Sequence, residues 1–475
     1  MKVTVIGTGY VGTVTGVCLA YLGHHVSCVD TDETKISRLQ RGDIPIYEPF
    51  LAELLPLAAR KGGLEFTTDL FSAVRASDVI FIAVGTPSKP TGEADLTYLE
   101  SAARSVGAAL DGGRYTVVIN KSTVPVGSGN LVGTLVREGI LEARGSDQGF
   151  EFGIASNPEF LREGSAIADS LFADRIVIGT EDSRTLEILR ELYRPLIHQT
   201  FDPPSFMHRP SRLSGTPLVT TTITSAEMIK YASNSFLAMK IGFANEMANI
   251  CERVGADAIE VMQGIGLDSR IGTAFLNAGI GWGGSCFGKD VRSLLHISNE
   301  YGYQPKLLEA SLSVNDGQRL VAIQKLQERL FIIKGRTIGL LGLAFKPNTD
   351  DLRDAPSLQI AERLLQMGAR VKAYDPIAMQ VCKEQNPALK ITYCDDAMAL
   401  ADKADALVVI TEWPEFRELS LPLLAQRMSH AVMVDGRNLY SPEEARRAGF
   451  DYTGIGRANH RQNAPVEPLE VSQTA

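Results

Sequence analysis

Several features that mark special classes of protein are absent from this 475-residue sequence. No apolar run reaches the roughly 18 residues that a membrane span needs, and the first residues lack the charged, apolar and small-residue regions of a signal peptide. Charged residues make up 22% and hydrophobic residues 44%, which argues against disorder, collagen and coiled coil. We therefore expect a globular cytoplasmic protein of two to four domains.

Cysteine pairs and metal-ligand clusters are also missing. The six cysteines are far apart, without a CxxC pair: Cys18, Cys28, Cys251, Cys286, Cys382 and Cys394. This pattern fits a reducing compartment and predicts no metal site.

The sequence has no excess of positive charge. Its 47 Lys and Arg against 56 Asp and Glu give a formal net charge of −9, which disfavours nucleic acid and anionic membranes as partners. We expect a small-molecule ligand, and an anionic one would need locally placed cations.

Short β-branched runs alternate with helical segments at both ends of the chain. In the first part they lie at 2–7, 25–30, 64–67, 78–84, 115–120 and 151–156, and in the last part at 336–342, 370–374, 405–411 and 431–435. Such alternation predicts α/β architecture: two Rossmann-like, doubly wound parallel-sheet domains.

The middle of the chain has a helical pattern, with a long helix expected from Ser225 to Val254 and another over 306–330. The long helix would bridge the two α/β domains, and the apolar face of this region could form a homodimer. The proline-rich stretch 201–224 predicts a connecting loop. The expected division is a dinucleotide-binding domain at 1–200, the loop at 201–224, a central helical domain at 225–331, a second Rossmann-like domain at 332–456 and a flexible tail at 457–475.

A glycine-rich turn follows the first expected strand. The motif Gly7-Thr8-Gly9-Tyr10-Val11-Gly12 leads directly into a helix, and the next strand ends in Asp30, 18 residues after Gly12. This order predicts a dinucleotide site, with Asp30 on the adenosine ribose and NAD favoured over NADP. Asp32, the competing carboxylate, is better explained as a helix cap.

Cys286 stands out from the other cysteines. It lies among glycines and immediately before a helical segment, where the helix dipole and the Lys289 ammonium would favour the nucleophilic thiolate. Asp290, one turn further on, is a candidate base for orienting water, although it could equally be a plain helix N-terminal carboxylate. A hydride acceptor combined with a nucleophilic thiol predicts oxidation past an aldehyde to a thioester, which water then cleaves.

Seven motifs in order resemble the UDP-glucose/GDP-mannose dehydrogenase family. They are GTGYVG at 7–12, GTPS at 85–88, STVPVG at 122–127, NPEFLREG at 157–164, GGSCFGKD at 283–290, LAFKPNTDDLRD at 343–354 and DGRNLY at 435–440. The resemblance implies a four-electron, NAD-dependent oxidation of a nucleotide sugar, with UDP-glucose favoured as substrate and UDP-glucuronate as product. Gly288 departs from the family pattern, which usually has proline there.

The resemblance also implies roles for residues that the pattern alone does not single out. Cys286 is the implied nucleophile, and Lys230 and Asn234, four apart on one helix face, would stabilise the oxyanion. Thr123 and Glu163 would assist proton transfer, while Asp290 would orient the hydrolytic water. Without the resemblance, Lys230 would be taken as a solvated helix charge.

Ligand contacts are implied in the same way. Cofactor contacts fall on Gly7, Gly9, Tyr10, Val11, Gly12, Asp30, Lys35, Thr86, Thr123, Glu163, Lys289 and Arg353. Substrate contacts fall on Glu159, Phe160, Leu161, Arg162, Glu163, Lys230, Asn234, Arg270, Phe275, Leu276, Asn277, Ala278, Gly279, Gly283 and Lys346. Arg270 resembles a residue that the partner subunit supplies in family members. Glu159 and Glu163 are also spaced like an ordinary helical surface pair.

Two other functions remain open from the sequence. The chain could be a 6-dehydrogenase of another nucleotide sugar, GDP-mannose or a UDP-N-acetylhexosamine. It could also be a non-catalytic NAD and nucleotide-sugar sensor, because a fold alone does not determine function.

Overall fold

The computed structural model describes residues 1–87, 89 and 92–457, and these form two compact units. The first unit comprises Met1–Phe236, Gly284–Glu309 and Lys346–Asp351. The second comprises Leu237–Gly283, Ala310–Phe345 and the chain from Leu352 onward. The domain division expected from the sequence stays a prediction, and the expected tail beyond Arg457 lies outside the described residues.

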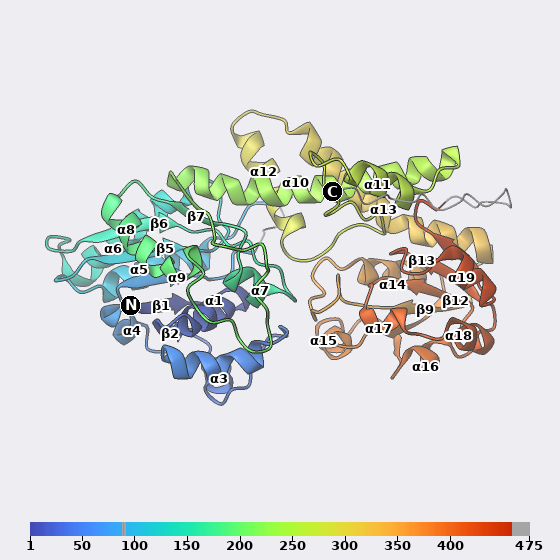
Figure 1. The fold of residues 1–475 in the computed structure, drawn as a ribbon, viewed down its shortest axis with the longest axis horizontal. Coiled ribbons are helices and arrows are strands. Elements are labelled where there is room, and N and C mark those ends of the chain that lie inside the picture. Colours follow the sequence, from blue (N-terminus) through green and yellow to red (C-terminus); the bar gives the residue numbers. More distant parts are fainter. Residues whose placement is uncertain (88, 90–91, 458–475) are drawn as a thin grey trace. The chain divides into compact units, whose positions relative to one another are not determined.

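The sheet of the first unit has the strand order β3-β2-β1-β4-β5-β6-β7-β8. Figure 1 labels β1, β2, β5, β6 and β7 of this sheet. Its strands are β1 (Lys2–Ile6), β2 (His25–Val29), β3 (Leu64–Thr67), β4 (Val79–Ile82), β5 (Thr116–Asn120), β6 (Phe152–Ser156), β7 (Ile176–Gly179) and β8 (Leu218–Thr221). Neighbouring strands are parallel except β6 and β7, which meet in one antiparallel pair, Ser156 with Gly179.

Both faces of this sheet are covered, which explains why its strands are continuous apolar runs. On β4, Val79 and Phe81 belong to one hydrophobic cluster and Ile80 and Ile82 to another, and all four are fully buried. Alternate side chains of a strand point to opposite faces, so helices pack on each side. This is the doubly wound arrangement that the sequence predicts.

Helices connect these strands. In the first unit they are α1 (Tyr10–Tyr21), α2 (Glu33–Gln40), α3 (Leu51–Lys61), α4 (Leu70–Ala76), α5 (Thr97–Ala109), α6 (Ser128–Arg144), α7 (Ala166–Leu171), α8 (Ser183–Leu192), α9 (Arg194–Ile197) and α12 (Phe287–Glu300). The long helix α10 (Ile223–Val254) begins in the first unit and ends in the second, and α13 (Lys306–Leu330) does the same. No helix in the described part of the chain is long and apolar enough to cross a membrane.

The connecting loop expected at 201–224 is wrong at its end. Leu218–Thr221 forms strand β8, which pairs in parallel with β7, and α10 begins at Ile223 rather than at Ser225. The strand lies at the sheet edge with mostly half-exposed side chains, so no alternation of apolar and polar residues marks it. The prolines that precede this strand favoured the prediction of a loop, although the strand itself is rich in β-branched residues.

The second unit contains a six-stranded sheet in the order β11-β10-β9-β12-β13-β14. Its strands are β9 (Thr337–Leu341), β10 (Arg370–Tyr374), β11 (Thr392–Tyr393), β12 (Ala406–Val409), β13 (Val432–Asp435) and β14 (Asp451–Gly454). Its helices are α11 (Ala258–Gly266), α14 (Pro356–Gln366), α15 (Met379–Gln385), α16 (Ala397–Ala401), α17 (Pro414–Arg417), α18 (Leu421–Arg427) and α19 (Pro442–Arg447). This order repeats that of β3 to β6 in the first sheet, which confirms the predicted pair of Rossmann-like domains.

The acid at the end of the second strand differs between the two sheets. Asp375 follows β10 at the position that Asp30 occupies after β2, and it is fully buried. Its carboxylate accepts hydrogen bonds from the backbone of Leu343 (2.7 Å) and Ala344 (3.0 Å) and from the Trp413 indole (3.1 Å). In the second sheet the carboxylate at this position therefore stabilises the fold of its own unit.

Candidate active site

The glycine turn of the first unit leaves space for a phosphate group. Gly7 has a φ of 97°, and a Cβ there would lie 2.7 Å from the Ala83 carbonyl oxygen. A Cβ on Gly12 would overlap the carbonyl of Gly7, so helix α1 packs against the strand only with glycine there. Gly9, by contrast, has no atom within 4 Å of a Cβ position. The open position stands at the N-terminus of α1, the arrangement that binds a pyrophosphate.

Asp30 lies at the end of β2, beside this turn. Its Oδ2 accepts hydrogen bonds from the Thr8 backbone (2.8 Å), the Thr8 hydroxyl (2.7 Å) and the Lys35 ammonium (3.0 Å). Burial opposes its charge, but these donors lower the pKa of Asp30 overall. Asp32 caps helix α2 by accepting from the Lys35 backbone at 3.0 Å, as predicted. Asp30 is thus an ionised carboxylate at the position expected to bind a ribose.

Two residues from separate motifs meet after strand β5. The hydroxyl of Thr86 donates to the carbonyl oxygen of Thr123 at 2.7 Å. The contact joins the segments that follow β4 and β5, which are neighbouring strands. The loops from these carboxyl ends border the same edge of the sheet as the glycine turn.

Lys230 on α10 is a buried cation rather than a solvated helix charge. It is 4% exposed, and its Nζ donates to Glu159 Oε1 at 2.7 Å. Burial alone would favour a neutral amine, but the charges of Glu159 and Asp290 raise the pKa of Lys230. The other oxygen of Glu159, Oε2, is buried without a hydrogen-bond partner among the described residues. Glu159 is therefore no helical surface residue, and one of its oxygens can accept from a ligand.

Asp290 is held between two side chains. Its Oδ2 accepts from the Asn234 amide at 2.6 Å and its Oδ1 from the Lys289 ammonium at 2.7 Å. Asp290 is 1% exposed, and it lies in the first turn of α12. A hydrogen bond between Tyr231 and Ser293 (3.2 Å) links α10 to α12 close by. The structure therefore brings Lys230, Asn234 and Asp290 to one place.

Cys286 is the residue directly before α12, and it is exposed while the other five cysteines are buried. Although the residue is open to solvent, desolvation by the surrounding protein raises the pKa of the Cys286 thiol, and the Glu159 charge adds to the rise. Lys230 opposes the rise. The expected activation by Lys289 is therefore wrong, because the Lys289 ammonium is paired with Asp290 and Lys230 is the cation that favours the thiolate.

Glu163 and Lys346 also belong to this unit. The Thr349 hydroxyl donates to Glu163 Oε2 at 3.3 Å. Burial lowers the pKa of Lys346 overall, although the negative charges of Glu163 and Cys286 act in the opposite direction. The predicted anion-binding lysine is thus electrostatically coupled to the predicted nucleophile.

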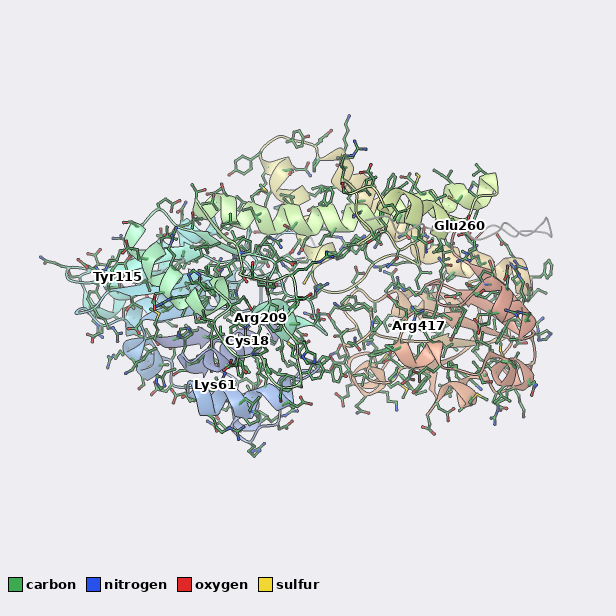
Figure 2. All side chains as sticks on the ribbon, viewed as in Figure 1. Cys18, Lys61, Tyr115, Arg209, Glu260 and Arg417 are labelled. Carbon is green, nitrogen blue, oxygen red and sulfur yellow. The ribbon has the colours of Figure 1, made fainter. Side chains whose placement is uncertain are left out.

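A cavity of about 400 Å³ opens beside Glu159. Its wall includes Lys121, Asn157 and the backbone that carries Phe160 to Arg162. Met207, His208 and Pro210, from the stretch expected to be a connecting loop, complete it. Figure 2 places Arg209 of this stretch, whose guanidinium donates to the carbonyl of Phe201 at 2.5 Å. The stretch is therefore folded and lines the cavity.

Of the predicted ligand contacts not yet described, Tyr10 and Val11 lie in the first turn of α1, and the rest belong to the second unit. Gly279 donates from its backbone to Asn245 of α10 (2.8 Å) and accepts from Gln318 of α13 (2.7 Å). Leu276 is buried against Ala244. The others are Arg270, Phe275, Asn277, Ala278, Gly283 and Arg353.

Sequence reasoning missed Lys121, which follows β5. Its ammonium donates to Asn157 Oδ1 at 3.0 Å, and burial lowers the pKa of Lys121 to about 8. Asn157 Oδ1 also accepts from the Tyr193 hydroxyl at 2.6 Å. The position of Lys121 at a strand end, directly before the STVPVG motif, was an available signal.

The fold, the glycine turn and the ionised Asp30 define an NAD-binding dehydrogenase of the Rossmann type. Three family models cover the chain in order: the NAD binding domain of the UDP-glucose/GDP-mannose dehydrogenase family at 1–197, its central domain at 224–317 and its UDP binding domain at 339–442. The chain belongs to the UDP-glucose/GDP-mannose dehydrogenase family.

Individual relatives agree with this assignment. UDP-glucose 6-dehydrogenase TuaD of Bacillus subtilis is 48% identical over 468 residues, covering 98% of this chain and 95% of that protein. UDP-glucose 6-dehydrogenase of Rhizobium meliloti is 47% identical, covering 96% of this chain and all of the relative. The solved structure of a UDP-glucose dehydrogenase from Pyrobaculum islandicum is 40% identical with a TM-score of 0.84, covering 96% and 98%. A UDP-D-ManNAc dehydrogenase from Pyrococcus horikoshii is 27% identical with a TM-score of 0.80, covering 96% and 99%.

Proposed function

We propose that this chain is a UDP-glucose 6-dehydrogenase that works through a covalent intermediate on Cys286. One UDP-glucose, two NAD⁺ and one water would give UDP-glucuronate, two NADH and three protons. The glycine turn and Asp30 would hold NAD, which would supply the hydride acceptor in both oxidations. The observation that carries the proposal is one accessible thiol, Cys286, in the same unit as the buried Lys230 and the buried, hydrogen-bonded pair Asn234 and Asp290.

In the first oxidation the C6 hydroxyl loses its proton and C6 loses a hydride, which leaves an aldehyde. Oε2 of Glu159, which has no hydrogen-bond partner among the described residues, would accept from a sugar hydroxyl. Thr123 and Glu163 assist the proton's departure in this proposal. Lys121 provides a second amine near Glu159, with a pKa of about 8.

In the second stage the Cys286 thiolate attacks the aldehyde carbon. A C–S bond forms, the carbonyl π bond breaks, and the oxygen becomes an oxyanion. The Lys230 ammonium and the second N–H of the Asn234 amide would stabilise this charge, since one N–H already donates to Asp290. Departure of a second hydride restores the carbonyl and leaves a thioester.

Hydrolysis of the thioester completes the reaction. A water molecule oriented by Asp290 attacks the thioester carbon, the C–S bond breaks, and Cys286 leaves as a thiolate. Asp290 is suited to this role because Asn234 and Lys289 fix both of its oxygens in place. One proton of the attacking water passes to the Asp290 carboxylate.

The ligand contacts that the resemblance implies are part of this proposal. Tyr10, Val11, Lys35, Thr86 and Arg353 would contact the cofactor, while the backbone of 159–163, Lys346 and the loop 275–283 would contact the sugar nucleotide. The five cations Lys230, Lys289, Lys346, Arg270 and Arg353 would offset the phosphates in a chain of net charge −9.

Counting NADH per UDP-glucose tests the proposal. We expect two NADH per sugar and UDP-glucuronate as product, identified by mass spectrometry. Cys286→Ser should abolish net oxidation while NAD binding remains, and the matched control Cys394→Ser, at a buried cysteine of the second unit, should not. Unchanged turnover in Cys286→Ser would overturn the covalent mechanism.

Another nucleotide sugar is the second candidate, because the solved relatives include the UDP-D-ManNAc dehydrogenase. The higher identity to UDP-glucose 6-dehydrogenases, 48% against 27%, favours UDP-glucose. Parallel assays with UDP-glucose, GDP-mannose and UDP-N-acetylhexosamines decide between them. A non-catalytic sensor would form no NADH with any of these sugars.

We further propose a homodimer formed through α10. Phe236, Phe243 and Ile250 are spaced seven residues apart on this helix and are 59%, 46% and 45% exposed. Such a repeated apolar stripe fits a second copy of the chain. Arg270, whose side chain is 87% exposed, would then be available to the second copy's site. Sedimentation of wild type and Phe243→Glu tests this, with a monomeric wild type as the contradicting result.

A further inference from the structure

Glu48 lies between α2 and α3 and joins two loops of the first unit. Its Oε2 accepts hydrogen bonds from the Tyr10 hydroxyl and from the backbone N–H of Gly164 (2.6 Å). Its Oε1 accepts from the backbone N–H of Ala166 at 2.7 Å. The carboxylate is 7% exposed, so these donors replace the water that it would otherwise bind.

In the proposed function, one of these loops holds the cofactor, and the other carries Glu163, which the resemblance assigns to both the cofactor and the sugar nucleotide. Tyr10 lies in the glycine turn of the cofactor site, and Gly164 directly follows Glu163. The Gly164 N–H also donates to the Tyr10 oxygen at 3.0 Å, so Tyr10, Glu48 and Gly164 form a closed triangle. Tyr10 and Gly164 are 154 residues apart in sequence, so the fold alone brings them together. Helices α1 and α7 also pack against each other, and the Glu48 carboxylate adds a polar contact beside this packing.

The turn at Gly164 has little freedom of its own. Gly164 has a φ of 80°, and a Cβ there would lie 2.6 Å from the Asn348 carbonyl oxygen. Ser165, the N-cap of α7, makes no side-chain cap bond, so Glu48 receives the N–H of the first helical residue, Ala166. The Glu48 carboxylate thus binds the backbone on the C-terminal side of Glu163, at the N–H groups of Gly164 and Ala166.

We propose that Glu48 is a positioning residue. It holds the glycine turn and the turn at Gly164 at a fixed distance and orientation, so that the bound cofactor lies against the reacting carbon of the sugar. Glu48 acts through the Tyr10 hydroxyl and two backbone N–H groups and touches neither ligand. The inference rests on the proposed function, since it assigns the two turns to NAD and to the sugar nucleotide.

The variant Glu48→Gln tests this role. The amide has nearly the same shape, but its NH₂ group must point at the Tyr10 hydroxyl or at a backbone N–H, so at least one buried donor loses its acceptor. We expect the KM for NAD and for UDP-glucose to rise together, each by about tenfold, and kcat to fall. Glu48→Asp, which keeps the charge on a shorter side chain, should recover part of this loss. Glu53→Gln, at an exposed residue of α3, is the matched control and should match wild type.

A double-mutant cycle separates positioning from general destabilisation. Tyr10→Phe removes only the hydroxyl, and if Glu48 acts through it, the losses of NAD affinity in Tyr10→Phe and Glu48→Gln will be markedly less than additive in the double variant. Fully additive losses, or Glu48→Gln with a lower melting temperature but wild-type KM values, would overturn the inference. NAD affinity is measured without sugar, so failure of wild type to oxidise UDP-glucose would count against the proposed function alone.

Discussion

The side-chain amide of Asn234 donates to Asp290 at 2.6 Å, and both side chains are buried. Asn234 comes from the long helix α10 and Asp290 from the first turn of α12, 56 residues later. The proposed oxyanion donor and the proposed water-orienting base are thus one connected unit. Changing either side chain should therefore disturb the function of the other.

Asp290→Asn should uncouple oxidation from hydrolysis. An amide at this position cannot take a proton from water, so the thioester should form and then persist. We expect a burst of two NADH per active site followed by turnover slowed about a hundredfold or more, and intact-mass measurement should find the sugar nucleotide bound to Cys286. Full turnover with no adduct would show that Asp290 does not activate water.

The charges around Cys286 predict how its alkylation depends on pH. Glu159 raises the pKa of the Cys286 thiol and Lys230 lowers it. The thiolate reacts with iodoacetamide, so the rate rises with pH through the thiol pKa. Glu159→Gln should move the midpoint of this rise to lower pH, and Lys230→Met should move it to higher pH. Equal midpoints in wild type and both variants would contradict this electrostatic account.

Lys121 should make stability depend on pH in the alkaline range. Burial lowers the pKa of Lys121 to about 8 from the 10.5 of an ordinary lysine, so between these pH values the unfolded chain binds more protons than the folded chain. Stability contributed by this group therefore rises with pH from about 8 to 10.5, by at most about 1.4 kcal/mol per pH unit. Urea unfolding of Lys121→Met should lack this contribution. Lys306→Met, on the exposed surface of α13, should keep the wild-type dependence.

Asp30 should control the choice between NAD and NADP. Asp30→Ala removes the ribose acceptor and frees the Lys35 ammonium, which can then attract a 2′-phosphate. We expect weaker NADH binding and a fall of about tenfold in the ratio of NADH to NADPH affinity, measured by fluorescence titration. Asp32→Ala removes only the cap of α2 and should leave that ratio unchanged. An unaltered ratio in Asp30→Ala would mean that the ribose lies elsewhere.

Residues that act locally could be predicted from the sequence. The glycine turn is recognisable because its three glycines lie within six residues. Gly7 and Gly12 have no room for a side chain, and Gly9 leaves open space at the helix N-terminus. Cys286 could be singled out as the candidate nucleophile for a similar reason, because the glycines around it and the helix that follows are adjacent to it in the chain. The burial of Lys230 could not be derived from its own helix, because Glu159 on a distant segment compensates its charge.

Other parts of the site depend on contacts that no local pattern reveals. Glu48 binds groups 38 and 116 residues away, so nothing near it in the sequence indicates its partners. The prediction that Lys289 activates the Cys286 thiol was wrong for the same reason. The closeness of Lys289 and Cys286 in sequence does not reveal that the Lys289 ammonium is paired with Asp290. Strand β8 was missed because an edge strand with half-exposed side chains has no burial pattern.

The contrast between Asp30 and Asp375 bears on how such a chain could be redesigned. The second sheet repeats the order of strands β3 to β6 of the first sheet, but Asp375 accepts hydrogen bonds from the backbone of 343–344 and from Trp413. The carboxylate of Asp375 is therefore fully occupied by groups of its own unit. Engineering a second dinucleotide site there would require replacing Trp413 and rebuilding the 343–344 turn.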